Sequence, residues 1–424
     1  MSKVITPNKS VAVNPLKLSQ PLGAALAFLG VKGAIPLFHG SQGCTAFAKV
    51  MLVRHFREAI PLATTALNEV ATILGGEENL KQSLEVLLKK AQPELIGLCS
   101  TALSETRGED VAGILRTCDL PIPVVYANTP DFYGSFSDGY SQAVAAMVRT
   151  LPEPGVPNPR QVTLLMGSDL TPGEVAEVKQ LVQSFGLTPI AIPDLGTSLD
   201  GHWADGYHGV TTGGVTVADL RSAGQSAFVL AIGETMRPAA QIWQERLGVT
   251  CTFFNSLTGL AASDRLVRCL MDWSGQPVPE WYRQQRRQLL DAMLDTHFYI
   301  TGKRVALALE PDLLSGISHF LVSMGAIVQG AVSPTRSPQL EHLPGEKVII
   351  GDLGDLQSAA AGADLLVTNS RGAPIAKALG IPLLRLGFPI FDRLGNGLRS
   401  YVGYRGTTQL LFDVGNLLLA AETH

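Results

Sequence analysis

Short apolar segments alternate with longer amphipathic segments along most of this 424-residue chain. The apolar segments predict strands, and helical periodicity predicts helices at residues 80–91, 172–185 and 313–324. Strands that alternate with helices form βαβ units, and nearly continuous apolar strands are typical of sheets covered on both faces. We therefore predict an α/β fold with parallel sheets. Its predicted strands are residues 95–99, 124–127, 162–166, 228–232, 305–309, 348–350, 365–368 and 383–386.

Two proline-containing breaks divide the chain into three parts of similar length. Residues 151–159 contain four prolines, which a regular helix or strand does not tolerate. Residues 275–279 contain two more and precede a long polar helix predicted from Glu280 to about Thr296. We predict α/β domains near residues 1–155, 156–295 and 296–424, the last with a final helix over residues 407–421.

Composition and motifs exclude several classes of protein. A net charge of −4 gives no sign of a surface for nucleic acid. No uncharged apolar run is long enough to span a membrane, and the first ten residues lack the apolar centre of a signal peptide. The chain contains no Walker loop, Gly-x-Gly-x-x-Gly, Gly-x-Ser-x-Gly or His-Glu-x-x-His motif. We expect a cytoplasmic protein without catalytic residues or a nucleotide site.

Cys44 stands in a different setting from the other four cysteines. Cys99 lies in a predicted buried strand, and the chain has no Cys-x-x-Cys pair. Cys44 instead closes the predicted turn His-Gly-Ser-Gln-Gly-Cys at residues 39–44, directly after an apolar run. Glycines there let the backbone approach a bulky group, and a thiolate is a ligand for soft metals. Cys44 is therefore the candidate metal ligand of this sequence.

One thiol is too few for an iron–sulfur cluster, which usually takes four. Either Cys44 is structural or the missing ligands lie on another chain. The basic residues Arg54 and Arg57 follow on a predicted helix that faces a partner, an anionic metal cluster or only solvent. Polar turns at residues 166–169, 232–235 and 309–312 are interpreted as ordinary βα connections, whereas residues 369–372 and 387–393 are expected to line one crevice.

Four motifs taken together resemble those of the nitrogenase component 1 family. They are residues 39–44, Asn-Thr-Pro-Asp-Phe at 128–132, Thr-Thr-Gly-Gly at 211–214 and Gly-Phe-Pro-Ile-Phe-Asp-Arg at 387–393. The resemblance extends from about Asn14 to Leu418 and implies three Rossmann-like α/β domains per subunit. The first motif, followed by Arg-His-Phe-Arg-Glu at 54–58, resembles the β-type branch.

Departures from that branch are as informative as the matches. A catalytic nitrogenase β subunit supplies three cysteines to the P-cluster at the interface with its α partner. In this chain Ser19 and Ala102 stand at two of the three corresponding positions, and Cys99 would point to the opposite face of its strand. The pattern resembles the scaffold branch, on which the iron–molybdenum cofactor matures. It implies that Cys44 is this chain's only ligand to a smaller 4Fe–4S cluster.

The resemblance also implies partners. A NifE-like subunit would supply three more cysteines, form a heterotetramer with two copies of each chain, and hold most of the transient iron–molybdenum cofactor precursor. The nitrogenase iron protein would supply electrons. This chain would then be a scaffold subunit and not an enzyme. The alternatives are a subunit of a nitrogenase-like reductase, such as dark-operative protochlorophyllide reductase, and a ligand-binding α/β protein in which Cys44 is structural.

Overall fold

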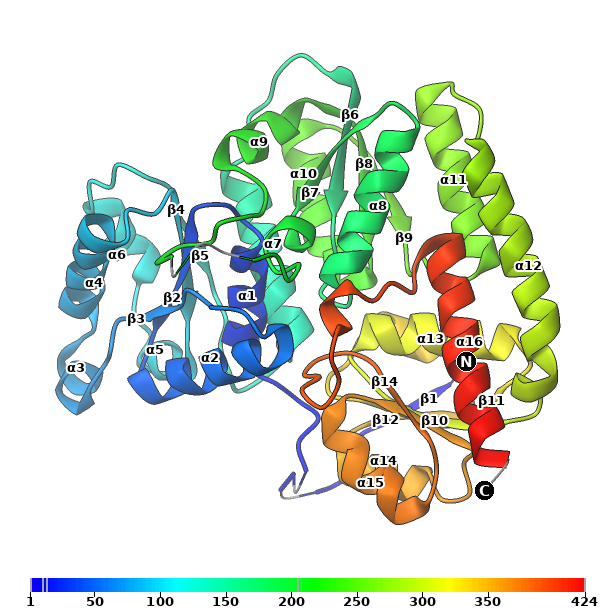
Figure 1. Ribbon diagram of the computed structural model, residues 1–424. Coiled ribbons are helices and arrows are strands. Elements are labelled where there is room, and N and C mark those ends of the chain that lie inside the picture. The colour runs from blue at the N-terminus through cyan, green and yellow to red at the C-terminus, as the bar shows by residue number, and fades with distance from the viewer. Residues whose placement is uncertain (1, 10, 13, 204–205, 207, 423–424) are drawn as a thin grey trace.

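Three separate parallel sheets, each flanked by helices, make up the chain (Figure 1). The computed structural model describes residues 2–9, 11–12, 14–203, 206 and 208–422. Every paired strand in these sheets runs parallel to its neighbour, which confirms the predicted α/β class. Within the described residues, no helix is both long and apolar enough to cross a membrane.

The first sheet has the order β3-β2-β4-β5. Its strands are β2 (Ala34–His39), β3 (Ala63–Thr64), β4 (Leu95–Ser100) and β5 (Val124–Ala127). Both β2 and β4 are buried at all six positions, because helices cover both faces of the sheet. The helices of this part are α1 (Gln20–Leu29), α2 (Gln42–Phe56), α3 (Glu69–Leu74), α4 (Glu77–Lys90), α5 (Ala102–Arg107), α6 (Val111–Thr117) and α7 (Phe136–Thr150).

The second sheet has the order β7-β6-β8-β9 and lies uppermost in Figure 1. It consists of β6 (Asn158–Leu165), β7 (Thr188–Ile192), β8 (Ser226–Ile232) and β9 (Cys251–Phe254). A capping box between Thr171 and Glu174, with a proline at the first position, begins helix α8 (Pro172–Ser184). The other helices of this part are α9 (Val217–Ser222), α10 (Arg237–Leu247) and α11 (Leu260–Ser274).

The third sheet has the order β1-β12-β11-β10-β13-β14. Its strands are β1 (Lys3–Ile5), β10 (Arg304–Ala308), β11 (Ile327–Ser333), β12 (Lys347–Ile350), β13 (Leu365–Thr368) and β14 (Leu383–Arg385). Its helices are α13 (Pro311–Ser323), α14 (Leu353–Ala359) and α15 (Ala373–Leu379). Two long helices, α12 (Glu280–Ile300) and α16 (Gly403–Glu422), pack side by side at the right of Figure 1.

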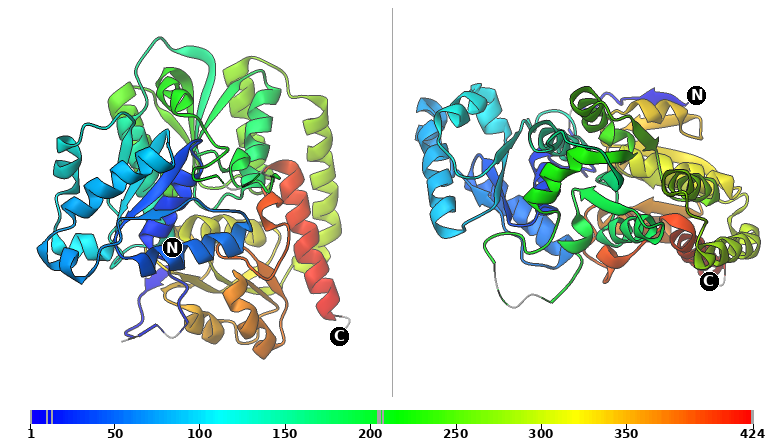
Figure 2. Two further views of the ribbon diagram at one scale, coloured as in Figure 1. Left: turned by 60° about the vertical axis from the view of Figure 1, so that its left-hand side comes forward. Right: turned by 90° about the horizontal axis from the view of Figure 1, so that it is seen from above.

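Strand β1 belongs to a sheet built from the other end of the chain. Lys3 pairs with Lys347 and Ile5 with Ile349, so the chain begins beside the third sheet and then crosses to α1. Figures 1 and 2 show this blue strand among the yellow and orange elements, apart from the other blue segments. The predicted division at residues 155 and 295 stays a prediction, but the third sheet also draws on residues from the first part.

Candidate metal centre and the pocket between the sheets

Cys44 lies in the first turn of α2, with its side chain exposed. The expectation that Cys44 closes a turn is wrong, because the helix begins earlier, at Gln42, with Ser41 as its N-cap. The Ser41 hydroxyl caps no backbone N–H but donates to the Cys44 thiol, with 3.4 Å between Oγ and Sγ. The sequence motif thus forms a strand end, a short link and a helix start that presents a thiol to the outside.

The start of α2 favours a negatively charged group beside Cys44. The backbone N–H groups of Gln42, Gly43 and Cys44 have no acceptor within the helix, because they belong to its first turn. They carry the positive end of the helix dipole. A Cβ placed on Gly43 would meet nothing within 4 Å, so space is open in front of this turn. A metal-bound thiolate suits such a position.

Neighbouring strands bring the starts of α2 and α5 together. His39 at the end of β2 is level with Ser100 at the end of β4. The Thr101 hydroxyl donates to the His39 carbonyl at 2.9 Å, and a Cβ on Gly40 would lie 2.5 Å from the Thr101 Oγ1. Glycine is therefore required at position 40, because the segments that follow β2 and β4 approach each other too closely for a side chain there. Ala102, the first residue of α5, follows directly.

The start of α1 lies at the same edge of the sheet. Gln20 donates from Nε2 to the carbonyls of Pro130 and Tyr133, both at 2.8 Å. The same loop is tied to β4, because the Thr129 N–H donates to Ser100 Oγ at 2.7 Å. Ser19, the N-cap of α1, thus begins a third helix at this edge.

Three helices therefore begin at one edge of the first sheet, at the three positions that the family resemblance singled out. Ser19 is the N-cap of α1, Cys44 lies in the first turn of α2, and Ala102 is the first residue of α5. Only one of the three is a thiol. Cys99 is fully buried in β4, as predicted for a cysteine on a buried strand, and burial raises the pKa of its thiol.

The imidazole of His39 is engaged inside the chain and is not free to bind a metal beside Cys44. Its Nδ1 lies 3.0 Å from Thr65 Oγ1 and its Nε2 lies 2.5 Å from Glu109 Oε2, so both ring nitrogens have partners inside the chain. Burial lowers the pKa of this imidazole, while Glu109 opposes that effect. Among the described residues, no group of three or more His, Cys, Asp or Glu side chains is arranged to hold a metal ion. This chain alone offers one exposed thiol.

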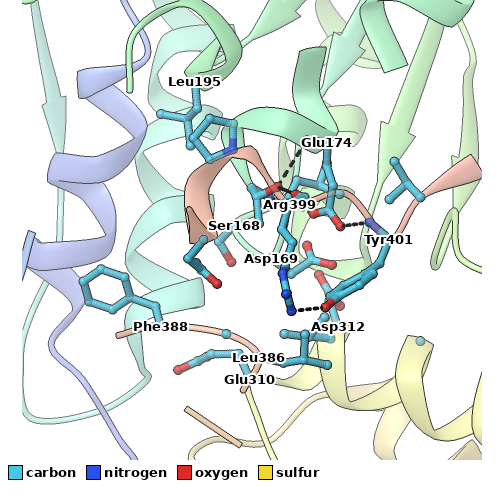
Figure 3. Close-up of a pocket in the computed structure, with 18 of the residues that line it drawn as sticks. Ser168, Asp169, Glu174, Leu195, Glu310, Asp312, Leu386, Phe388, Arg399 and Tyr401 are labelled. Carbon is cyan, nitrogen blue, oxygen red and sulfur yellow. Dashed lines mark hydrogen bonds between the residues drawn. The ribbon is translucent and has the colours of Figure 1, made fainter. Parts of the chain in front are cut away.

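A separate cavity of about 80 Å³ lies where strands of the second and third sheets end (Figure 3). Acidic side chains from the connections of both sheets line it, together with Phe388 and Tyr401. The turns at residues 166–169, 232–235 and 309–312, interpreted from the sequence as ordinary connections, supply Asp169, Ile232, Glu310 and Asp312. The one signal in the sequence that could have indicated this cavity is that each turn directly follows a predicted strand.

Buried carboxyl groups around this cavity join the three parts of the chain. Asp312 at the start of α13 accepts from the N–H groups of Glu234 and Thr235, both at 3.1 Å. Glu310 accepts from the hydroxyls of Ser135 and Ser137, at 2.7 and 2.6 Å, at the start of α7. Burial raises the pKa of Glu310 to about 7. The carboxyl groups thus hold the ends of different sheets to one another.

Two further carboxyl groups differ in how they are satisfied. Glu174 accepts from the N–H groups of Thr171 and Tyr401, at 2.8 and 2.9 Å, and burial raises its pKa to about 7. Asp169 Oδ1 is buried without a hydrogen-bond partner among the described residues. Burial, followed by the charge of Asp312, raises the Asp169 pKa, which favours its neutral form.

The two C-terminal turns expected to line one crevice do lie together. Asn369 Nδ2 donates to the Phe388 carbonyl at 3.0 Å, and the Phe391 N–H donates to Ser370 Oγ at 3.0 Å. Helix α2 packs against the same turn, because the Ile390 N–H donates to His55 Nδ1 at 2.9 Å. The C-terminal half of α2 is therefore anchored to the third part of the chain.

The fold and the edge with its single thiol define a class of protein. The family described as "Nitrogenase component 1 type Oxidoreductase" matches residues 19–419, and the chain belongs to this family. The solved structure "Nitrogenase Cp1 at pH 6.5" matches it with a TM-score of 0.92 at 31% identity, over 98% of this chain and 95% of that one. A chain of "Nitrogenase Cp1 at pH 5", at 13% identity and a TM-score of 0.74, shares the fold.

Several curated relatives that match over nearly the full length are named "Nitrogenase iron-molybdenum cofactor biosynthesis protein NifN". The chain is 56% identical to that protein of Nostoc sp. (strain PCC 7120 / SAG 25.82 / UTEX 2576), over 100% of this chain and 96% of the relative. It is 51% identical to that of Rippkaea orientalis, covering 100% and 97%. The identity to the Klebsiella pneumoniae protein is 39%, covering 100% and 95%. The predicted family resemblance is confirmed.

Proposed function

We propose that this chain is a non-catalytic scaffold subunit for maturation of the nitrogenase iron–molybdenum cofactor. In this proposal Cys44 is its only ligand to a 4Fe–4S cluster shared with a NifE-like partner. The observation that carries the proposal is the set of three helix starts at one edge. Cys44 is an exposed thiol there, whereas Ser19 and Ala102 offer no thiol at the other two starts. The names of the relatives support the biosynthetic role.

The residues at this edge fit a shared cluster better than a cluster held by one chain. Cluster irons are normally held by four thiolates, and this edge supplies one. The open first turn of α2 would direct its free N–H groups toward an anionic cluster. When bound, such a cluster would supply one-electron transfer. Cys44 would anchor it, and the Ser41 hydroxyl would donate a hydrogen bond to the thiolate sulfur.

The wider assembly is part of the same proposal. Two copies of this chain and two of a NifE-like subunit would form a cytoplasmic heterotetramer, in which the NifE-like subunit holds most of the cofactor precursor. The nitrogenase iron protein would bring electrons to the shared cluster. Because the ligands come from two chains, loading the cluster would be coupled to assembly of the subunits.

The test uses the complex of this chain with its partner, purified without oxygen. Iron content and the EPR spectrum are compared for the unchanged chain, Cys44→Ala and the control Cys118→Ser, which lies at the end of α6, away from this edge. We expect Cys44→Ala to lose cluster iron and its EPR signal while the control keeps both. Equal iron and identical spectra in all three complexes would refute the role of Cys44. Reduction of a tetrapyrrole by the unchanged complex would favour the nitrogenase-like reductase instead.

A further inference from the structure

Helix α2 carries more than Cys44 on its outward side. Phe47 and Val50 are exposed to 64% and 52%, and Arg54 follows on the same side of the helix at a spacing of four residues from Val50. Arg57 is exposed directly after the helix, as its C-cap. Along the outward side of α2, the exposed thiol is therefore followed by apolar side chains and then by two arginines. A helix that faced only solvent would not need to expose such large apolar side chains.

The arginines at the end of this face are held in place by neutral groups. The Arg54 guanidinium stacks over the Phe391 ring, 4.1 Å from its centroid. Arg57 Nη2 donates to the Phe391 carbonyl at 3.0 Å. From the third part of the chain, Arg371 donates to the Pro15 carbonyl at 3.1 Å and contacts Met51 Sδ on α2 at 3.7 Å.

No carboxylate of the described residues forms an ion pair with these arginines or with the nearby Lys49. The carboxylates that line the depressions beside Phe391, Glu58 and Asp392, have other partners. Asp392 pairs with Arg385 at 2.8 Å, and Glu58 accepts from the Gly201 N–H at 2.9 Å. Arg371 is only partly exposed, and burial together with the charge of Arg54 lowers its pKa. These positive charges thus stand close together, and none of them forms an ion pair with a carboxylate in the described part of the chain.

We propose that a cationic surface beside the end of α2 docks an acidic segment of the partner subunit. This surface is formed by Lys49, Arg54 and Arg57, together with Arg371 from the third part of the chain. The proposal rests on the proposed function in one respect, namely that a partner covers the Cys44 edge. Two shallow depressions flank Phe391: Lys49, Arg54, Arg57 and Glu58 line one of them, and Arg371 and Asp392 line the other. Carboxylates in them would form ion pairs with guanidinium groups that are already oriented.

A protein segment explains the surface better than a small anion does. A small anion would neutralise the arginines but leave Phe47 and Val50 exposed on the same helix face. A partner would cover both, with the apolar side chains beside Cys44 at the centre and the arginines toward the rim. Charged groups at a rim chiefly steer and orient association, and their effect falls as salt screens them.

The first experiment measures the dissociation constant of this chain and its partner as the salt concentration rises. We expect the double variant Arg54→Gln/Arg371→Gln to weaken association about tenfold at low salt and to flatten its salt dependence. When Arg371→Lys replaces Arg371→Gln in the double variant, part of the lost affinity should return. The matched control is Arg160→Gln, which removes an exposed cation on β6 of the second sheet. Unchanged affinity and salt dependence in the double variant, with the fold intact by circular dichroism, would overturn the proposal.

A second experiment identifies the occupant. A zero-length carbodiimide reagent joins a lysine amine to a carboxylate in contact with it, so Lys49 should cross-link to an acidic residue of the partner. That product should disappear in Lys49→Gln and be identified by mass spectrometry. Tight binding of citrate at these arginines, without any effect of the variants on partner affinity, would assign the site to a small anion and overturn the proposal.

The two proposals fail separately. If Cys44→Ala retains the cluster iron while the arginine variants weaken assembly, the cluster assignment fails and the docking surface stands. If the iron is lost with Cys44 while the arginine variants assemble normally at every salt concentration, the docking surface fails alone.

Discussion

The hydroxyl of Thr101, directly after β4, donates to the carbonyl of His39 at the end of the neighbouring strand β2, with 2.9 Å between Oγ1 and O. This hydrogen bond fixes the distance between the segments that start α2 and α5. It leaves no room for a side chain at Gly40, which faces Thr101. The position of Cys44 four residues later depends on this contact, because α2 starts directly after it.

We therefore expect Gly40→Ala to displace the start of α2. A Cβ there would lie 2.5 Å from Thr101 Oγ1, and such overpacking costs about 1–3 kcal/mol of unfolding free energy. Gly43→Ala is the matched control, because a Cβ at Gly43 meets nothing within 4 Å. Urea unfolding of the three proteins measures the effect. Equal stability of the Gly40 and Gly43 variants would show that the close approach to Thr101 is not limiting.

Glu310 should make the protein less stable as pH rises from about 4.5 to about 7. Burial raises its pKa to about 7 in the folded chain, from 4.5 for an ordinary glutamate, so the folded state binds more protons in that interval. The contribution is fully present below pH 4.5 and is lost as pH passes 7. Glu310→Gln, whose amide oxygen can still accept from Ser135 and Ser137, should remove it.

The measurement is the difference in unfolding free energy between Glu310→Gln and the unchanged chain at several pH values. Taking a difference cancels the titration of all other groups. The variant should gain relative stability steadily across this interval. A difference that does not change with pH would mean that Glu310 titrates normally in the folded state.

His55 should act in the opposite direction at lower pH. Burial lowers its pKa to about 3 from 6.5, and its neutral Nδ1 accepts from the Ile390 N–H. The unfolded chain therefore binds more protons between these values, so this contribution to stability falls as pH drops from 6.5 toward 3. His55→Gln, compared with the unchanged chain by urea unfolding at each pH, should lack this acid-dependent loss. Parallel stability curves for the two proteins would contradict the prediction.

Removal of the Asp312 carboxylate should loosen the junction between the second and third sheets. Asp312→Ala would leave the buried N–H groups of Glu234 and Thr235 without an acceptor, at a cost of about 3 kcal/mol. Asp291→Ala, an exposed carboxylate on α12, provides the control and should be nearly neutral. Thermal and urea unfolding report the difference. Similar stabilities of the two variants would mean that Asp312 is dispensable to the junction.

Thiols added at the two other helix starts should change the cluster. If the edge around Cys44 faces a shared cluster, Ser19→Cys/Ala102→Cys would offer three thiolates, and we expect altered iron content and a new EPR spectrum in the complex. The same double variant with Cys44→Ala shows whether the new thiols need the original one. A spectrum identical to that of the unchanged complex would place Ser19 and Ala102 away from the cluster.

The fold class was predictable because buried parallel strands are almost wholly apolar. Residues 124–127 and 365–368 match β5 and β13 in full. Strands with polar or proline interruptions escaped prediction: β7 contains Pro189, and β11 contains Gln329 and Gly330. In these strands pairing with neighbours overrides a weak local pattern.

The candidate site could be predicted only where its residues lie close together in the sequence. The motif around Cys44 pointed to a thiol at a sharp change of direction, although the helix starts two residues before the thiol. The meeting of Glu310 with Ser135, or of Arg371 with Met51, depends on how three sheets pack. Such contacts join residues far apart in the chain, and no periodicity of one segment reports on them.

The placement of β1 has a consequence for how the chain is made. Lys3 pairs with Lys347, so β1 is synthesised long before β12, its neighbour in the sheet. Contacts this distant in sequence form late and slow folding. Until β12 is synthesised, the edge of the third sheet is incomplete and the N-terminal segment is free to meet other chains. The third sheet thus gains its β1 edge only after residues 347–350 have been made.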